Sequence, residues 1–415
     1  MAKLRDWGED RGMRVDWRAD GRLWAFAVSV LAYGAASAPA PPGIRPQELL
    51  VFAGIALFTG IAGPWRFFAG LEVARAPAPL AAGSAIMVWL LWQGFMRGLW
   101  NGWGLTDMMR DIVPMLFLAL PLLLAPILGR LSPDRSDRLA DAAAAAGVLF
   151  TLRWWHDAGM ALSAVGTSPL GEGRYYLLNS ALVPFASVWL GLRATRWLLL
   201  PQPTRGEWAQ ALLAAAGCLS CLLAQAATLH RAGLILSLLA LGLGMGRWLW
   251  RRPALFITLF LLASAALIGI GARVAGVAAL LADKTENVGL NNRIDELLAV
   301  LDQVGRDPLA FLIGDGWGAL VPNPAVGWWR VSYTHSAASY FLLKLGALGL
   351  ALMLGLAGLL TGLLARAARD MPMLLLAIAP SLLLGAFLHT SFKYLCFSLL
   401  LSLAIGRAYA SLYRH

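Results

Sequence analysis

Apolar and polar positions alternate along the chain in long blocks. Runs of about 20 apolar residues, enough for a helix to cross a bilayer, recur between short charged segments. This pattern predicts about twelve transmembrane helices. The run from Leu139 to Phe150 is alanine-rich and weakly apolar, and the run from Met371 to Leu388 is short. The approximate centres of the predicted spans are Val30, Ile55, Trp89, Leu118, Ala145, Val188, Ala215, Leu239, Leu262, Leu350, Ala377 and Ser398.

The composition leads to the same class of protein. The chain of 415 residues is 59% hydrophobic and 14% charged, with a mean hydropathy of +0.67. Soluble globular domains average about 45–50% apolar and about 25% charged residues. The sequence therefore predicts an all-α, polytopic membrane protein and excludes a soluble globular one.

The placement of Lys and Arg predicts the orientation. With a cytoplasmic N-terminus, the cytoplasmic segments hold 21 of the 34 basic residues and the outer segments hold 13, five of them in one long loop. Short cytoplasmic loops carry the excess of positive charge, so both termini are predicted to be cytoplasmic. The predicted order is a tail (1–22), spans one to nine (23–272), a long outer loop (273–334) and spans ten to twelve (335–415).

The net charge indicates which partners to expect. The formal net charge is +11, mostly cytoplasmic, and neither an aromatic–basic RNA motif nor zinc-finger spacing accompanies it. We therefore expect membrane lipids as partners and no nucleic acid.

A signal peptide ending near Ala36-Ser37-Ala38 is an alternative for the first span, but the acidic tail and Pro39 favour an uncleaved helix.

The long outer loop contains a predicted helix. Asn291-Asn292 is placed to cap a helix that runs from Arg293 to about Val304. Its acidic residues lie mostly off its apolar face, so it resembles a lid that rests on the helix bundle or in the membrane surface. The apolar face consists of Ile294, Leu297, Leu298, Leu301 and Val304.

Turns are predicted after this helix, at the Gly-Asp-Gly-Trp-Gly stretch 314–318 and around Pro322 and Pro324. The loop ends at Thr334-His335-Ser336, and an apolar helix resumes at once. A histidine at this junction lies where water, lipid headgroups and a lipid-linked substrate meet. His335 is therefore the best candidate for a catalytic residue.

Arginines occur at other points of the predicted outer side. Arg174 lies in the loop from about 153 to 176, ahead of Asn179-Ser180, and Arg231 lies in the very short connection from Thr228 to Gly233. An arginine in so short a loop sits at or below the headgroup plane, where a charge usually has a partner. Arg293 opens the predicted loop helix.

These residues are suited to chemistry on a diphosphate. Arginine forks bind phosphate oxygens, and histidine accepts protons near neutral pH. Arg174, Arg231 and Arg293 would hold a polyprenyl diphosphate while His335 takes the proton of an attacking hydroxyl. The simpler alternatives are headgroup anchors for the arginines and a structural role for the histidine.

No metal or other cofactor is expected. Cys218, Cys221 and Cys396 all lie in apolar runs, and no neighbouring His or carboxylate completes a metal site. They are expected to be buried apolar residues without a structural disulfide. The outer side has no Asp-x-Asp motif, and Asp283 and Asp315 are isolated.

Several of these stretches together resemble the O-antigen ligase and polymerase superfamily of membrane glycosyltransferases. The likeness covers mainly residues 170–350, and the first five spans are similar in hydropathy only. The stretches that carry it are Thr-x-x-Arg-x-Gly at Thr228–Gly233, Arg293, Gly-Asp-Gly-Trp-Gly at 314–318, His335-Ser336, and Gly346 with Gly349.

Two positions depart from the usual family pattern. His230-Arg231 stands where Ser-Arg is usual, and His335-Ser336 stands where His-Asn is usual. His-Ser is similar to the ligase branch, whereas His-Asn is common in the oligosaccharyltransferase branch. Polymerases of the superfamily typically have two large outer loops with Arg-rich motifs, and this chain has one.

The resemblance implies an O-antigen ligase of a Gram-negative inner membrane with a GT-C-like helical fold. Such an enzyme transfers a glycan from undecaprenyl diphosphate to a sugar hydroxyl of lipid A–core on the periplasmic face, by a metal-independent inverting displacement. His335, Arg231 and Arg293 would be catalytic, with Arg174 also on the donor diphosphate. Supporting roles are expected for Asp315, Ser336 and Asn179.

Other functions remain open. Within the superfamily they are an O-antigen polymerase and a protein O-oligosaccharyltransferase. A transporter of polyprenyl-linked glycans would show charges near the bilayer midplane or inverted repeats. The sequence shows neither, since Arg153 and Lys344 lie within a few residues of predicted span ends. A non-catalytic scaffold for cell-envelope assembly would not need the arginines and the histidine.

Overall fold

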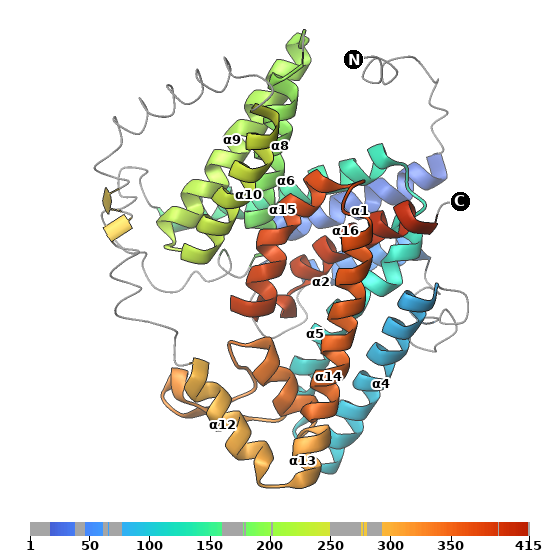
Figure 1. Ribbon diagram of the computed structural model, residues 1–415, viewed down its shortest axis with the longest axis vertical. Coiled ribbons are helices and arrows are strands. Elements are labelled where there is room, and N and C mark those ends of the chain that lie inside the picture. The colour runs from blue at the N-terminus through green and yellow to red at the C-terminus, as the bar shows by residue number, and fades with distance from the viewer. Residues whose placement is uncertain are drawn as a thin grey trace.

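The computed structural model of the protein is built almost entirely of α-helices, with one short two-stranded sheet (Figure 1). The all-α fold class predicted from the sequence is thereby confirmed. The structure describes residues 17–37, 46–60, 65, 77–159, 177, 180–200, 202–249, 275–276, 278–279, 293–388 and 390–413.

Among the described residues before position 250, the helices are α1 (Trp17–Ala36), α2 (Pro46–Thr59), α4 (Ala78–Trp100), α5 (Leu105–Leu128), α6 (Pro133–Ala158), α8 (Leu182–Leu198), α9 (Arg205–Ala227) and α10 (Arg231–Leu249). After them come α12 (Arg293–Gly305), α13 (Pro308–Ile313), α14 (Ala337–Arg366), α15 (Pro372–Leu383) and α16 (Leu395–Tyr413). Shorter elements are β1 (Val321–Asn323), the 3-10 turn η4 (Pro324–Val326), β2 (Trp329–Val331), the π-helical turn η5 (Leu384–Leu388) and the 3-10 turn η6 (Thr390–Lys393).

The predicted spans coincide with these helices. Every predicted centre lies within one of them except Leu262, which is outside the described residues. Within the described part, α4, α5, α9, α14 and α16 are long and apolar enough to cross a membrane, and shorter apolar stretches occur in α1, α2, α10 and α15. The alanine-rich α6 belongs to neither group, in keeping with its low apolarity in the sequence. Several helices therefore have transmembrane character.

Close helix packing holds the bundle together. α1 packs on α2 and α6, α6 on α8, α8 on α9, α10 and α15, and α5 on α16. A Cβ added at Gly147 of α6 would lie 2.4 Å from the carbonyl oxygen of Leu182 in α8. Small residues allow such close approach between membrane helices. Large apolar side chains such as Leu213 and Leu354 point outward, as expected for surfaces that face lipid.

We name the end of the molecule that carries α12 and α13 the outer end (Figure 1). There, Asn101 and Trp103 donate hydrogen bonds to the carbonyl oxygen of Asp315, each at 2.9 Å. Elsewhere in the molecule, Arg407 of α16 donates to the carbonyl of Pro133 at the start of α6 (2.9 Å). These bonds join connections and helices that are far apart in the sequence.

The stretch 314–318 fixes the outer loop to α14. The helix α14 is interrupted at Gly346, whose φ of +69° is open to glycine. Just before this break, two helix carbonyls accept hydrogen bonds from the backbone N–H groups of Asp315 and Gly316, each at 2.9 Å. A Cβ on Gly314 would lie 2.4 Å from the backbone of α14. The stretch was predicted as a turn, and in the structure it is the anchor of the loop.

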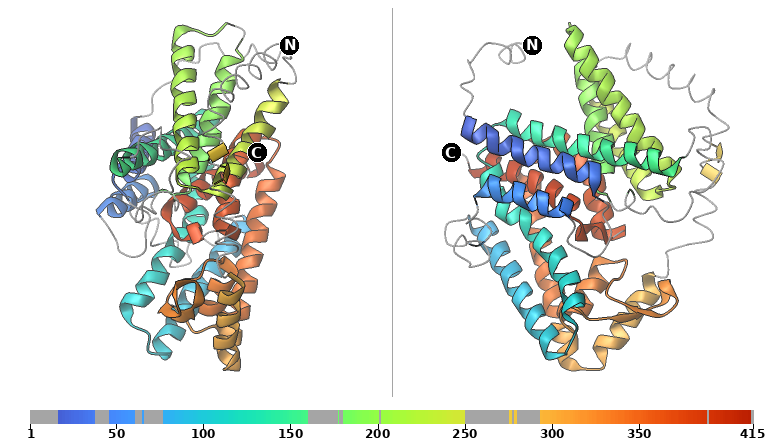
Figure 2. Two further views of the ribbon diagram at one scale, coloured as in Figure 1. Left: turned by 90° about the vertical axis from the view of Figure 1, so that its left-hand side faces the viewer. Right: turned by 180° about the vertical axis from the view of Figure 1, so that it is seen from behind.

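The same stretch is inserted against α4. Trp317 is fully buried and donates its backbone N–H to the carbonyl of Gly94 (2.9 Å) and its indole N–H to that of Leu91 (3.0 Å). The loop is therefore a folded layer over the ends of α4, α5 and α14. Figure 2 shows α12, α13 and the chain that follows them gathered at the outer end in both views.

The rest of the outer loop contains more regular structure than the sequence indicated. The predicted helix from Arg293 to about Val304 is confirmed as α12, but its cap at Asn291-Asn292 lies outside the described residues. The short helix α13 was not predicted. The segment around Pro322 and Pro324 forms a β-hairpin, in which Val321 pairs with Val331, instead of turns alone.

Most of the predicted apolar face of α12 is exposed. Ile294 is 62% exposed and Leu298 is 56% exposed, with Leu297 and Leu301 also exposed, whereas Val304 is buried. The other buried residues of α12 are Glu296 and Val300. The expectation that the whole face rests on the helix bundle is therefore wrong, and a position of the exposed part in the membrane surface stays a prediction.

Candidate active site

His335 forms an acid–base pair with a carboxylate that the sequence analysis did not single out. Its Nδ1 lies 2.7 Å from Oε1 of Glu296 on α12, and its backbone N–H donates to Oε2 at 3.0 Å. The carboxylate of Glu296 is 1% exposed, whereas the imidazole of His335 is 27% exposed. The pair joins the end of the outer loop to α12.

Glu296 is held in place by a third residue. Asn323, at the end of β1, donates its side-chain N–H to Oε1 of Glu296 at 2.6 Å and to the carbonyl of Tyr333 at 3.2 Å. Burial raises the pKa of Glu296, but the hydrogen bonds and charge of His335 and the hydrogen bond of Asn323 outweigh it. The pKa of Glu296 therefore lies below its ordinary value of 4.5 and the carboxylate is ionised at neutral pH.

This geometry prepares His335 to accept a proton. Because Nδ1 faces an ionised carboxylate, it carries the ring proton of the neutral imidazole, and the lone pair is then on Nε2. A carboxylate partner also stabilises the imidazolium that forms after proton transfer. The ring of Tyr333 meets the imidazole edge-on, with centroids 6.2 Å apart, and limits its rotation. His335 is therefore a partly exposed base whose tautomer is fixed.

The turn around His335 is fixed by its neighbours. Ser336 is the N-cap of α14 and accepts a hydrogen bond from the backbone N–H of Ser339 at 3.4 Å. The hydroxyl of Ser339 donates to the hydroxyl of Thr334 at 2.8 Å. The structure thus gives Ser336 a helix-capping role, which places His335 at the helix start.

The predicted arginines lie in different parts of the structure. Arg293 opens α12, one turn before Glu296, and is half-buried. Arg231 opens α10, which packs on α8 and α15. Figure 1 shows α10 beside α8 and α9 and shows α12 beyond them toward the outer end. Arg293 therefore lies on the helix that carries Glu296, whereas Arg231 lies on another helix. Arg174 and Asn179 lie outside the described residues.

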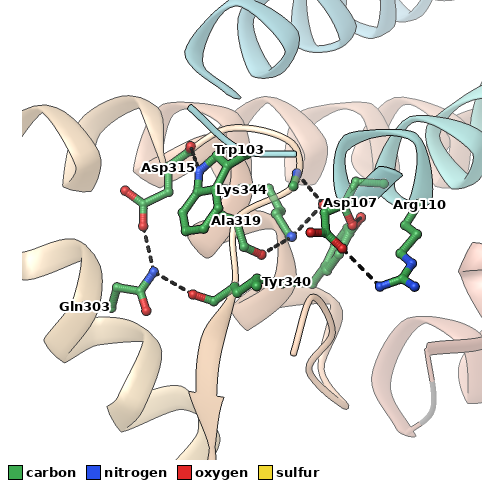
Figure 3. A network of polar contacts seen from close by, with 11 residues as sticks. Trp103, Asp107, Arg110, Gln303, Asp315, Ala319, Tyr340 and Lys344 are labelled. Atoms are coloured by element: carbon green, nitrogen blue, oxygen red, sulfur yellow. Dashed lines mark hydrogen bonds and ion pairs between the residues drawn. The ribbon is translucent and has the colours of Figure 1, made fainter. Parts of the chain in front are cut away.

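Asp315 lies in the folded outer loop, away from the His335 pair. Its carboxylate accepts a hydrogen bond from the side chain of Gln303 at 2.8 Å (Figure 3). Its backbone carbonyl accepts from Asn101 and Trp103, as described above. Asp315 therefore ties the connection between α4 and α5 to α12.

Lys393 lies against Tyr340 of α14. It ends η6, and its Nζ lies 3.7 Å from the centroid of the Tyr340 ring. Burial lowers the pKa of Lys393 to about 7, so the amine is only partly protonated at neutral pH.

A second acid–base pair is buried between α5 and α14. Nζ of Lys344 lies 2.5 Å from Oδ2 of Asp111, and the two side chains are 0% and 3% exposed. The same carboxylate accepts from the hydroxyl of Tyr340 (2.9 Å) and from the backbone N–H of Gly318 (2.7 Å). Lys344 also donates to the carbonyl of Ala319 (Figure 3).

This pair corrects the interpretation of Lys344. The sequence analysis placed it near the end of a span, and in the structure it is fully buried and paired with a carboxylate of α5. Part of the signal was present in the sequence, because Lys344 stands within an otherwise apolar run, whereas Asp111 follows Asp107 and Arg110 in a more polar stretch. Glu296 and Asn323 had no comparable signal, since polar residues are ordinary in an outer loop.

The described residues contain no group of three or more His, Cys, Asp or Glu side chains that could hold a metal ion. In the part of the chain that the structure covers, Cys218, Cys221 and Cys396 lie within α9 and α16 and form no disulfide.

Comparison with known proteins does not identify a family for this chain. No family model matches the sequence, and no curated protein is significantly similar to it.

Proposed function

We propose that the protein is a membrane glycosyltransferase of the O-antigen ligase type. It transfers a glycan from undecaprenyl diphosphate to a sugar hydroxyl of lipid A–core on the periplasmic face of a Gram-negative inner membrane. The observation that carries the proposal is the Glu296–His335 pair, a partly exposed histidine held by a buried carboxylate where the outer loop meets α14. The sequence resemblance to the superfamily supports the choice of substrates.

The proposed reaction is a single displacement. Nε2 of His335 takes the proton of the acceptor hydroxyl, and the hydroxyl oxygen forms a bond to the anomeric carbon of the donor sugar. The bond between that carbon and the diphosphate oxygen breaks, and undecaprenyl diphosphate leaves with the electron pair. Attack from the face opposite the leaving group inverts the anomeric configuration. Glu296 stabilises the imidazolium and does not itself transfer a proton.

Arg293 would stabilise the departing diphosphate, because it lies one turn from Glu296 on α12. Arg231 and Arg174 keep their proposed role toward the donor.

The proposed membrane arrangement has twelve spans, with both termini in the cytoplasm and α12 in the periplasm. Support comes from the excess of Lys and Arg in the predicted inner connections. Reporter fusions after Leu200 and after Arg369 should read cytoplasmic, and fusions within 293–330 should read periplasmic. A periplasmic reading at Arg369 would place His335 in the cytoplasm and contradict the proposal.

The decisive experiment is transfer by the purified protein. The protein is reconstituted in nanodiscs with an undecaprenyl-diphosphate glycan and lipid A–core, and the product is resolved by gel and mass spectrometry. Formation of glycosylated lipid A–core supports a ligase. Extension of the donor on itself would indicate a polymerase, and transfer to a peptide would indicate a protein O-oligosaccharyltransferase. Absence of any transfer under conditions where the donor binds would refute the proposal.

A transporter of lipid-linked glycans is the second candidate, because it is favoured by the buried Asp111–Lys344 pair. Asp111 also accepts the backbone N–H of Gly318, so the same pair fixes the outer loop. Proteoliposomes that carry a fluorescent undecaprenyl-diphosphate glycan separate the two candidates. A transporter moves the lipid between leaflets without an acceptor, whereas a ligase leaves its sidedness unchanged.

A further inference from the structure

A pocket of about 450 Å³ opens at the outer end of the molecule. It lies between the α4–α5 connection, the end of α12, α13 and the hairpin, and its lining does not include Glu296 or His335. Small-ligand sites occupy about 300–1,000 Å³, so the pocket is large enough for part of an oligosaccharide. None of the residues that line the pocket has a role in the proposed reaction.

The walls of the pocket are held by hydrogen bonds within the protein. Arg97 of α4 is 8% exposed, and its guanidinium pairs with Asp307 at 3.2 Å. Asn101 and Trp103 both donate to the carbonyl of Asp315. Gln303 connects the carboxylate of Asp315 to a loop carbonyl. Side chains from three separate parts of the chain are thus fixed in place before a ligand binds.

The charge of the lining is positive. Three guanidinium groups, of Arg97, Arg306 and Arg330, face two carboxylates. Both carboxylates are already engaged, since Asp307 caps α13 and pairs with Arg97, and Asp315 accepts from a glutamine. Arg306 pairs with Asp302 but is 74% exposed, and Arg330 donates to the carbonyl of Leu320. A guanidinium has five N–H donors, so both retain donors for an anionic ligand.

The other lining groups suit a sugar. The side-chain amide of Asn101 keeps one N–H donor and its carbonyl acceptor for hydroxyl groups, and Gln303, whose two N–H groups bond within the protein, offers its carbonyl as an acceptor. Trp103 offers an aromatic face, over which the guanidinium of Arg330 lies at 6.0 Å from the ring centroid. Aromatic rings with a few polar groups that fix orientation are the usual lining of a small-molecule site. The combination of ring, amides and guanidinium groups matches a saccharide that carries acidic groups.

We infer that this pocket binds an anionic saccharide, with its phosphate or carboxylate groups on Arg306 and Arg330 and its hydroxyl groups on Asn101 and Gln303. This inference rests on the proposed function, because it assigns the pocket to one of the two glycans of that reaction. Gln303 and Glu296 lie seven residues apart on α12, which is about 10 Å along the helix axis. A bound oligosaccharide therefore extends from the pocket toward His335.

Direct binding tests the inference without turnover. The probe is the oligosaccharide that mild acid releases from rough-type lipopolysaccharide. Its counterpart is the same oligosaccharide after phosphatase treatment and reduction of its carboxyl groups. Binding to the protein in nanodiscs is followed by saturation-transfer NMR and thermophoresis. We expect the wild type to bind the charged form at least about tenfold more tightly than the neutral form.

Substitutions then locate the site. Arg306→Gln with Arg330→Gln should abolish the preference for the charged form, and both positions are accessible enough to change without loss of folding. Arg110→Gln is the matched control, because Arg110 is also an exposed arginine at the outer end but does not line the pocket. The control should behave as the wild type. The inference would be overturned if the double variant still preferred the charged oligosaccharide. It would also be overturned if the wild type bound the charged and the neutral oligosaccharide equally well.

Kinetics distinguish the two possible sources of the saccharide. If the pocket holds the acceptor, the double variant raises KM for lipid A–core and leaves KM for the donor unchanged. The opposite result assigns the pocket to the donor glycan. If the wild type binds the charged oligosaccharide but transfers no glycan, the saccharide site stands and the proposed function is wrong. Transfer with unchanged KM for both substrates in the double variant would refute the pocket assignment.

Discussion

Two acid–base pairs lie in the outer part of this molecule, and each joins a carboxylate to a residue at or near the start of α14. Asp111 and Lys344 are 3% and 0% exposed, and the carboxylate accepts hydrogen bonds from three groups. Glu296 is equally buried, but the imidazole of His335 is 27% exposed. The pairs therefore differ mainly in whether the basic partner can meet a substrate.

This difference separates a structural pair from a reactive one. A buried amine that is bonded to a carboxylate and a carbonyl has little capacity left for a ligand. An imidazole uses one nitrogen for its carboxylate and keeps the other for a proton. Changing the first pair should therefore affect folding, whereas changing the second should affect turnover.

Lys344→Met should destabilise the protein by about 3–5 kcal/mol, because it leaves the carboxylate of Asp111 buried without its cation. The measurement is the thermal unfolding midpoint and the yield of monodisperse protein in detergent. The double variant Lys344→Met with Asp111→Asn removes both charges and keeps an acceptor for Gly318, so it should recover most of the stability. If the single variant is as stable as the wild type, the structural role of the pair is wrong.

His335→Ala should lower glycan transfer by at least about 10²-fold, as expected for loss of a general base. The unfolding midpoint should change little, because the imidazole is partly exposed. Transfer rates are measured in nanodiscs at saturating donor and acceptor. His156→Ala, at the exposed outer end of α6, is the matched control and should keep full activity. Near-normal transfer by His335→Ala would remove this residue from the mechanism.

Glu296→Gln should lower the maximal rate by about 10-fold to 10²-fold, since the amide is neutral and stabilises the imidazolium less. The ionised carboxylate has a lowered pKa, so its contribution to stability is present above pH 4.5 and is lost as the pH falls through the folded-state value. Thermal unfolding of the wild type should therefore lose stability on the acid side, and the variant should lack this loss. Asp295→Asn is the exposed neighbouring control. An identical pH dependence in wild type and variant would contradict the assignment.

Leu297→Asp with Leu301→Asp should reduce transfer by only a few-fold. The two side chains are exposed on the apolar face of α12, so the substitutions leave the contacts of Glu296 intact. We expect the loss in lipid nanodiscs and not in short-chain detergent, because the face would meet lipid in the bilayer. Asp302→Asn, a polar change on the same helix, is the control. An equal loss in detergent would show that the face does not act through lipid.

The helices were largely predictable from the sequence because a bilayer demands long apolar runs. The break before Arg293 and the spacing of apolar residues also located α12 to within one residue at its end. The orientation of α12 was not predictable from periodicity alone. That criterion assigns the apolar face to the protein interior, whereas here Val304 is the one buried residue of that face and Glu296 is buried beside it.

The candidate site was predictable only in part. The position of His335 at the junction of loop and helix identified it without a structure. Its partner could not be found in this way, because 39 residues separate Glu296 from His335 and only the folded loop brings them together. The pocket was likewise invisible, since Arg97 and Arg330 come from elements that are far apart in the sequence.

The interruption of α14 at Gly346 has a consequence for where the hydrocarbon begins. A continuous helix of 30 residues would be about 45 Å long, well beyond the roughly 30 Å that the acyl chains occupy. The part that follows Gly346 is about 20 residues, or about 30 Å, and matches that thickness by itself. The first turns of α14, with His335 just ahead of them, would then lie outside the hydrocarbon. In the proposed reaction, a lipid-linked donor would present its reactive end there while its polyprenyl chain stays in the bilayer.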